Sequence, residues 1–345
     1  MSDGDGDGRA PTLRLQRKKA RVTFRALFVA RRAVLWHTSL RVAKHWRTIK
    51  AMGLSFQPPG AAPVIEAHGA RLPAIGLGTW RSTHEEGVQA VRAALAAGYR
   101  HIDTAARYEN EQAVGQALAA SGLPRDEVFV TTKVWHTELR AADFRRAAEA
   151  SVARLGLDHV DLLLVHWPNP DVPLEETIGA LCDAQRSGLT RHIGVSNFPA
   201  ALLDRAVALA SVPLAANQCE YHPYLDQTRV LDACRRHRMV LIAHTPLGSG
   251  KLLADPVIAD IAREYGRKPA QIILRWLVQQ PGVAAIPKSS NPLRIGENLA
   301  VFDFELDAGA MARIGALARA DGRVSKPAWH PEWDAPAHSS AADKP

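Results

Sequence analysis

From residue 64 onward, short apolar runs alternate with Ala- and Leu-rich amphipathic stretches, and this alternation limits the possible folds more than any other feature. We predict eight strands, at 74–79, 99–103, 128–133, 160–166, 191–195, 214–218, 240–244 and 283–287. Helical stretches follow them, for example at 84–97, 110–120, 140–155, 175–187 and 226–238. Several strands are apolar throughout, as expected when both faces of a parallel sheet are buried. Eight such units predict a single-domain α/β fold, the (β/α)8 or TIM barrel.

An open, doubly wound sheet is the main alternative fold. It would need a Gly-rich fingerprint directly after its first strand. The run GLGTW at 76–80 lacks the third glycine of that fingerprint. The sequence therefore favours the closed barrel over a Rossmann fold.

The ends of the chain differ from this pattern. We expect a basic N-terminal extension at 1–62, the barrel at 63–335 and a C-terminal tail at 336–345. The extension is predicted to be disordered or partly helical, and Met52 offers an alternative start. A surface-binding amphipathic helix over 22–36 is one alternative and a targeting peptide is another, although no apolar run with a small-residue cleavage site follows.

The net charge of +8 comes from this extension. Its residues 9–50 hold thirteen Lys and Arg and no acid, and three Asp precede them, so the extension carries +10 and the rest of the chain −2. We therefore expect no nucleic-acid partner for the barrel. No apolar run is long enough for a transmembrane segment. Three widely spaced cysteines (Cys182, Cys219 and Cys234) indicate reduced thiols and a cytoplasmic protein.

Four polar residues fall at or just past the ends of consecutive predicted strands. Asp103, Lys133 and His166 end the second, third and fourth strands, and Tyr108 follows Asp103 in its loop. Active sites of such barrels lie at the C-terminal ends of the strands, so these side chains should converge. Singly, each has an ordinary structural explanation, as a helix cap, a solvated strand end or a packing residue. Together they are harder to explain that way.

The chemistry of these four residues suits protonation of a carbonyl oxygen. A buried Lys133 needs a counter-charge, which Asp103 can supply. We expect the ammonium to pull the pKa of the Tyr108 phenol below its free value of about 10, which would make it a usable acid. His166 can donate a hydrogen bond to an oxygen that gains negative charge. We expect no metal, because no ligand cluster is apparent, and hydride from a nicotinamide is the simplest nucleophile.

Several runs resemble those of the aldo-keto reductases, and in particular bacterial 2,5-diketo-gluconate and methylglyoxal reductase-like members. They are GYRHIDTAARYENE (98–111), VFVTTKVW (128–135), DLLLVHWP (161–168), GVSNF (194–198), NQCEYHP (217–223) and IPKSSNPLRIGEN (286–298). The resemblance implies an NADPH-dependent oxidoreductase whose catalytic residues are Asp103, Tyr108, Lys133 and His166, with Tyr108 as general acid. It also implies a monomer.

The same resemblance implies a binding site for NADPH/NADP+. Its residues would be Ser196, Asn197 and Gln218 at the carboxamide, Thr245, Leu247 and Ser249 at the pyrophosphate, Lys288, Ser289 and Arg294 at the 2′-phosphate, and Glu297 and Asn298 at the adenine. Cations beside a small hydroxyl suit a phosphate monoester, which favours NADPH over NADH. His244 stands where the family often has a tyrosine that stacks on the nicotinamide, and a histidine ring is smaller and titratable.

Substrate residues are implied by position. Trp80 and Trp135 match the walls of the substrate pocket, with His166 facing the carbonyl, and Trp167 either joins them or packs in the core. The PEWD run at 331–334 resembles the closing loop of 2,5-diketo-gluconate reductases, and the connection at 168–177 is short. Short loops predict small polar carbonyl substrates such as methylglyoxal, keto-sugars and short aldehydes.

Two other classes of function stay open at this point. One is a non-catalytic NADPH-binding barrel that acts as a sensor, which the four intact polar residues disfavour. The other is a metal-dependent barrel hydrolase, which would need several more ligands at strand ends than Asp103 and His166.

Overall fold

In the computed structural model, residues 62–335 can be described. The predicted C-terminal tail, almost all of the N-terminal extension and the predicted helix over 22–36 lie outside this range. The barrel prediction is confirmed: eight strands form one parallel sheet in chain order. They are β3 (Leu77–Gly78), β4 (His101–Asp103), β5 (Phe129–Val134), β6 (Val160–Val165), β7 (Thr190–Ser196), β8 (Leu214–Glu220), β9 (Val240–His244) and β10 (Val283–Ala285).

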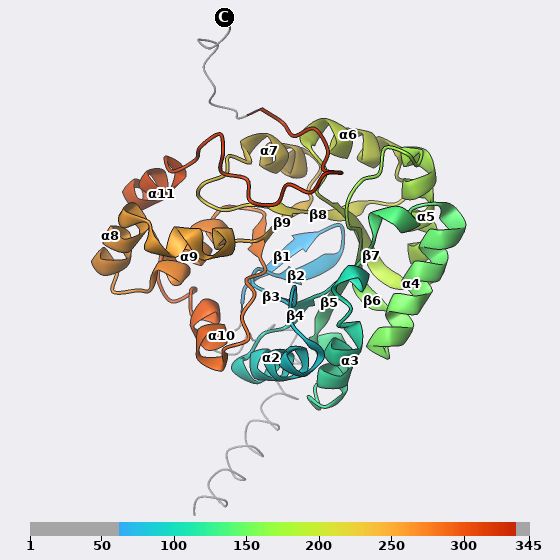
Figure 1. Ribbon diagram of the computed structural model, residues 1–345, viewed down its shortest axis with the longest axis horizontal. Helices are drawn as coiled ribbons and strands as arrows, with labels where there is room; N and C mark the ends of the chain where they lie inside the picture. The colour runs from blue at the N-terminus through green and yellow to red at the C-terminus, as the bar shows by residue number, and fades with distance from the viewer. Residues whose placement is uncertain (1–61, 336–345) are drawn as a thin grey trace, which may run out of the picture. The chain divides into compact units, whose positions relative to one another are not determined.

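The sheet closes on itself between its first and last strands. Parallel bridges join Ile75 to Ala285 and Gly78 to Lys288. The amide of Gly76 donates to the carbonyl of Ala285 at 2.9 Å. Figure 1 shows the resulting ring of strands, with helices on its outside. Closure removes both sheet edges and gathers the C-terminal ends of all eight strands at one face.

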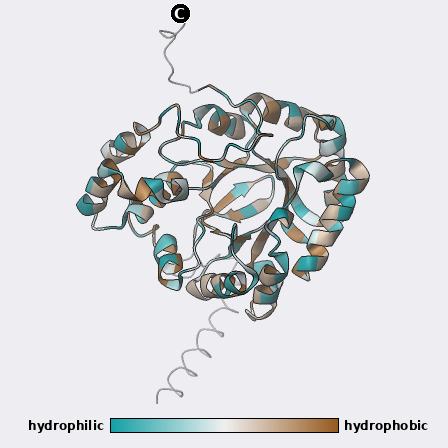
Figure 2. Cartoon of the chain, viewed as in Figure 1, coloured by the Kyte–Doolittle hydropathy of each residue, from teal (hydrophilic) through white to brown (hydrophobic). Residues whose placement is uncertain are grey.

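The outer helices are α2 (His84–Ala97), α3 (Glu111–Ala119), α4 (Ala141–Leu155), α5 (Leu174–Arg186), α6 (Ala200–Leu209), α7 (Thr228–Arg236), α8 (Pro256–Glu264), α9 (Pro269–Val278), α10 (Pro292–Leu299) and α11 (Ala308–Gly315). The five helices whose ranges were predicted, α2, α3, α4, α5 and α7, lie within two residues of those ranges, and no range was predicted for the other outer helices. Figure 2 shows hydrophobic and hydrophilic residues mixed along each outer helix, as expected for amphipathic helices with one apolar face. Local chemistry sets several ends: Asp255 and Asn291 cap α8 and α10, each followed by proline. No helix in the described part of the chain is both long and apolar enough to cross a membrane.

A hairpin absent from the predicted elements precedes the barrel. Strands β1 (Val64–Ala67) and β2 (Ala70–Pro73) pair antiparallel around His68 and Gly69, both at positive φ. The hairpin lies across the centre of the ring in the view of Figure 1. Its Leu72 belongs to the same apolar cluster as barrel residues such as Leu162 and Ile242. Each strand has only four residues, which is too few for a clear alternating pattern in the sequence. The role of the hairpin, which packs apolar side chains into the barrel interior, is therefore seen only in the structure.

One glycine sets how closely two outer helices pack. A Cβ on Gly115 of α3 would lie 2.2 Å from the backbone oxygen of Leu155, at the end of α4. We expect Gly115→Ala to lower the free energy of unfolding by about 1–3 kcal/mol, because the backbone must move to admit the methyl group. Urea unfolding followed by circular dichroism measures this change.

The control is Gly179 of α5, which is exposed and where an added Cβ meets nothing within 4 Å. Gly179→Ala should raise stability by up to about 1 kcal/mol through helix propensity alone. If both substitutions stabilised the protein equally, the close approach at Gly115 would be wrong.

Candidate active site

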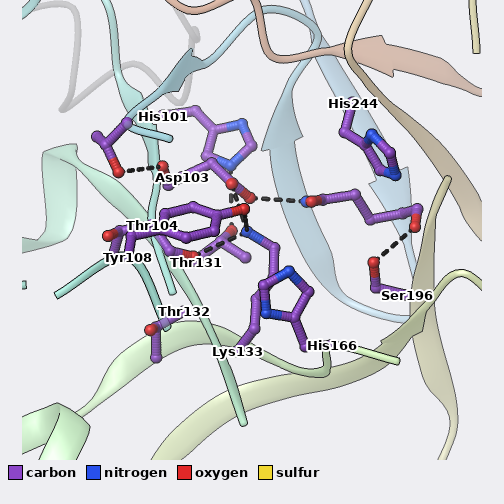
Figure 3. Close-up of polar contacts among 12 residues, drawn as sticks. His101, Asp103, Thr104, Tyr108, Thr131, Thr132, Lys133, His166, Ser196 and His244 are labelled. Atoms are coloured by element: carbon purple, nitrogen blue, oxygen red, sulfur yellow. Dashed lines mark hydrogen bonds and ion pairs between the residues drawn. The ribbon is translucent and has the colours of Figure 1, made fainter. Parts of the chain in front are cut away.

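The four predicted catalytic residues meet at the C-terminal end of the barrel (Figure 3). Asp103 ends β4, Lys133 lies near the end of β5, His166 directly follows β6, and Tyr108 ends the short 3-10 helix η1 (Ala106–Tyr108). Lys133 Nζ lies 2.5 Å from Asp103 Oδ1, 2.8 Å from the carbonyl of Thr104 and 3.5 Å from Tyr108 Oη. The His166 ring faces the Tyr108 ring edge-on, with centroids 5.6 Å apart.

The ion pair is fully enclosed. Lys133 and Asp103 are at most 1% exposed. Burial by itself would lower the pKa of Lys133, but the Asp103 carboxylate outweighs it and the pKa is raised. The ammonium is therefore charged at neutral pH. Gln218 Nε2 donates to the second Asp103 oxygen at 2.7 Å, so both carboxylate oxygens are occupied.

The predicted direction of the Tyr108 pKa is wrong. Burial raises this pKa, and the opposing charge and hydrogen bond of Lys133 only partly offset it. The sequence pattern indicated that Lys133 lies near Tyr108, but it could not show how strongly burial removes the Tyr108 phenol from water. The phenol is consequently protonated throughout the neutral range, the state that a proton donor needs.

The imidazole of His166 is neutral. Burial, followed by the charge of Lys133, lowers its pKa well below the ordinary value. Its Nδ1 is buried and has no hydrogen-bond partner among the described residues. An unsatisfied buried nitrogen is unusual in a folded protein and is often found where a ligand completes a functional site.

Two residues that the sequence analysis did not single out hold the Tyr108 loop. Asn110 Nδ2 donates to the carbonyl of Thr79 at 2.8 Å, and Thr104 Oγ1 donates to Asn110 Oδ1 at 2.9 Å. Both are buried. The sequence did hold a signal for these two residues, because both lie inside the DTAARYENE run. Buried polar residues around a catalytic loop usually fix its shape.

The residues predicted to meet the nicotinamide form a connected group beside the ion pair. Ser196 Oγ donates to the carbonyl of Gln218 at 2.7 Å, and Asn197 Nδ2 donates to the carbonyl of His166 at 3.0 Å. His244 makes hydrogen bonds through both ring nitrogens, to Asn197 Oδ1 and Thr245 Oγ1, each at 3.0 Å. These bonds fix the plane of the ring.

Burial lowers the pKa of His244 to about 4. The sequence left open whether this ring titrates near neutral pH. In the folded protein it is neutral above about pH 5, so it can serve as an uncharged aromatic surface.

The predicted pyrophosphate residues, Thr245, Leu247 and Ser249, lie in the loop after β9, and two of them share an unusual backbone conformation with Asn197. Asn197, Thr245 and Ser249 all have positive φ, at 63°, 53° and 54°. Such backbone is costly for residues other than glycine and is concentrated at functional sites. Leu247 packs against the core from the same loop, which continues into the 3-10 helix η4 (Gly248–Ala254).

The predicted 2′-phosphate and adenine residues lie on and before α10. Lys288 and Arg294 are exposed, whereas Ser289 and Asn298 are buried. Glu297 pairs with Lys268 of the neighbouring segment. The structure thus places an exposed arginine in the first turn of α10 and an exposed lysine in the segment before it.

Aromatic side chains surround Tyr108 and His166. The Trp80 ring centroid lies 4.9 Å from that of Tyr108, and the Trp135 centroid 5.0 Å from that of His166. Trp167 is buried and faces Trp333 at 6.5 Å.

The C-terminal segment adds residues that the sequence analysis missed. Trp329 stacks on His136 with centroids 4.9 Å apart and meets Trp135 edge-on at 5.8 Å. This C-terminal segment is attached to the barrel through Glu220, which is fully buried at the end of β8. Its carboxylate accepts hydrogen bonds from the amides of Val324 and Ser325 at 2.6 and 2.8 Å. The NQCEYHP run contained Glu220, but its partners lie about a hundred residues away.

Within residues 62–335, no group of three or more His, Cys, Asp or Glu is arranged to hold a metal ion. The three cysteines are buried free thiols.

Comparison with known proteins identifies the family. A sequence model described as the aldo/keto reductase family matches residues 74–319. Methylglyoxal reductase DkgB of Salmonella typhimurium is 41% identical over 266 residues, covering 76% of this chain and 99% of the relative. The chain belongs to the aldo/keto reductase family and is an oxidoreductase.

Two solved structures have the same fold. One, assigned as a 2,5-diketo-D-gluconic acid reductase B, is 45% identical with a TM-score of 0.79, over 80% of this chain and 99% of the other. The second is a Bombyx mori aldo-keto reductase in complex with NADP, 36% identical with a TM-score of 0.71, over 75% of this chain and 93% of the other.

Glu220 should determine how firmly the C-terminal segment is held. Burial by itself would raise its pKa, but the hydrogen bonds of His222 and of the Val324 and Ser325 amides lower it to about 2. A carboxyl with a depressed pKa stabilises the fold above its unfolded pKa of about 4.5, and this stabilisation is lost as the pH falls towards 2. We expect Glu220→Gln to lower the free energy of unfolding at pH 7 by about 2–3 kcal/mol.

Urea unfolding of both proteins at pH 7 and pH 3.5 tests this assignment. The difference between wild type and Glu220→Gln should be smaller at pH 3.5, because the wild-type carboxyl has begun to lose its advantage. A difference that is independent of pH would mean that the negative charge of Glu220 is not what binds the two amides.

Proposed function

We propose that this chain is an NADPH-dependent carbonyl reductase in which Tyr108 protonates the carbonyl oxygen of an aldehyde or ketone. The observation that carries the proposal is the enclosed Lys133–Asp103 pair, with its ammonium 3.5 Å from Tyr108 Oη. Bound NADPH would supply hydride to the carbonyl carbon. The protein then has to position the carbonyl and deliver one proton to its oxygen.

Tyr108 and Lys133 share the work of proton delivery. The raised pKa of Tyr108 keeps its proton in place until negative charge develops on the carbonyl oxygen. Once the proton leaves, the phenolate lies beside the Lys133 ammonium, whose charge Asp103 maintains. Neutral His166, at the edge of the Tyr108 ring, is suited to hold the oxygen by a hydrogen bond without competing as an acid.

The residues beside the ion pair fit a nicotinamide. Ser196, Asn197 and Gln218 bring hydroxyl and amide groups, the partners that a carboxamide needs, to the ends of adjacent strands β7 and β8. His244 would offer its fixed, neutral ring as a stacking surface. The NADP complex of the Bombyx mori relative supports the same cofactor here.

The residues on and before α10 fit the 2′-phosphate that distinguishes NADPH from NADH. Asn291 caps this helix by accepting from the amides of Leu293 and Arg294 at 2.9 and 3.2 Å. The exposed side chains of Lys288 and Arg294 add positive charge at the same end. An anion at the start of a helix is stabilised by the helix dipole as well as by such cations.

We infer small polar carbonyls as the substrates. The methylglyoxal reductase and the protein assigned as a 2,5-diketo-D-gluconic acid reductase, both more than 40% identical, are named for such compounds. Trp80 and Trp135 would wall the pocket. We also propose that the protein is cytoplasmic and monomeric.

Tyr108→Phe tests the proton donor. Removing the hydroxyl should lower kcat for a reactive aldehyde by about 10²–10⁴-fold, the usual contribution of a general acid. The dissociation constant for NADPH, followed by quenching of protein fluorescence, should change little, because the ring stays in place. Retention of most of the turnover would rule out Tyr108 as the acid, and a wild-type protein that binds NADPH without oxidising it would favour a sensor.

Arg294→Ala tests the 2′-phosphate site. We expect the dissociation constant for NADPH to rise about tenfold or more, the equivalent of one charge-assisted hydrogen bond, while that for NADH changes little. Arg313→Ala is the control, since this arginine pairs with Glu264 on another part of the surface. Equal losses of NADPH and NADH affinity in Arg294→Ala would contradict the assignment.

A further inference from the structure

Trp80 and Trp135, the tryptophans beside Tyr108 and His166, are each in contact with an arginine side chain. The guanidinium carbon of Arg81 lies 5.7 Å from the ring centroid of Trp80, and that of Arg107 lies 5.6 Å from the ring centroid of Trp135. Both arginines are exposed. A guanidinium at this distance is attracted to the aromatic ring, which limits where its charge can lie.

The two arginines lie over the tryptophans that border the reacting groups. Trp80 is next to Tyr108, and Trp135 is next to His166, with centroid separations of 4.9 and 5.0 Å. Trp135 therefore contacts both the Arg107 guanidinium and the ring of His166, on the side of the site where a carbonyl would meet Tyr108 and His166. A pocket lined by Arg107 and Trp135 includes neither Tyr108 nor His166, so an anionic group bound there would have to be several bonds from the carbonyl.

The two arginines differ in their partners. Among residues 62–335, no ion pair includes Arg81, whose backbone has a positive φ of 59°. Arg107 Nη1 lies 3.0 Å from Glu109 Oε1, and both side chains are more than half exposed. Such an exposed ion pair is worth at most about 1 kcal/mol, so a second carboxylate can replace Glu109 as its partner.

A pocket of about 500 Å³ opens beside Arg107. Its lining includes Arg107, Glu109, Trp135 and Glu138. Arg154, on the same lining, is already bound to the buried Glu111. Arg107 is thus the cation in this lining whose partner is exposed and replaceable, while Glu109 and Glu138 oppose an incoming anion.

We propose that Arg107 binds the carboxylate of substrates whose carboxylate lies several bonds from their carbonyl, and that Glu109 competes for the same guanidinium. This inference rests on the proposed reductase function and narrows it to carbonyl acids of extended shape. A planar guanidinium suits a carboxylate because it can donate two parallel hydrogen bonds.

The test compares 4-carboxybenzaldehyde with benzaldehyde, which share the reacting group and differ in the distant carboxylate. The measured quantity is the ratio of their kcat/KM values with NADPH. In Arg107→Gln this ratio should fall about fivefold, and in Glu109→Gln it should rise about two- to fivefold, because the guanidinium is released. Half-molar KCl should reduce the wild-type ratio through screening. Glyoxylate, whose carboxylate adjoins its carbonyl, should show no dependence on Arg107.

Arg145→Gln is the matched control, because Arg145 forms an exposed ion pair with Glu149 on α4. Its ratio should equal that of wild type. A ratio that is unchanged in both Arg107→Gln and Glu109→Gln would overturn the inference, as would equal losses on both aldehydes in Arg107→Gln. Reduction of benzaldehyde by the wild type tests the proposed function separately: activity without a charge-dependent ratio would refute this inference alone.

Discussion

The buried ion pair between Lys133 and Asp103 is the interaction on which the candidate site depends. Removing two charges from water costs several kcal/mol per ion, and only close contact with full hydrogen bonding offsets that cost. Here Lys133 Nζ has Asp103 and the Thr104 carbonyl, and Gln218 occupies the other oxygen of Asp103. Loss of either charge would leave the other buried and alone. The ends of strands β4, β5 and β8 are therefore linked by a network of hydrogen bonds as well as by the sheet.

Closure of the barrel makes this contact possible. The strands β4 and β8 are not neighbours in the sheet, yet Asp103 and Gln218 meet because all strand ends face the same opening. The hairpin formed by β1 and β2 contributes apolar side chains to the interior. The C-terminal segment then reaches the site through Glu220 and brings Trp329 beside Trp135. Strands thus carry the ion pair, while Tyr108 and the surrounding aromatic walls lie in the segments that follow the strands.

Much of the fold could be predicted from the sequence, because strong alternation between apolar runs and amphipathic stretches leaves few arrangements. The eight strands and the five helices with predicted ranges appear within a few residues of those ranges. The hairpin could not be predicted, since four-residue strands carry almost no periodicity. The Glu220 anchor was missed for a different reason: its partners are backbone amides, which any residue could supply from a distant segment.

The sequence by itself determined the order of the βα units and the identity of the polar residues at the strand ends, because both are local patterns. Only the tertiary structure decided the electrostatics of the site. Lys133 was expected to lower the pKa of Tyr108, yet burial outweighs the charge, and His244 is neutral at pH 7 because partial burial of the residue lowers its pKa. Desolvation depends on everything that surrounds a group, and those surroundings come from segments far apart in the chain.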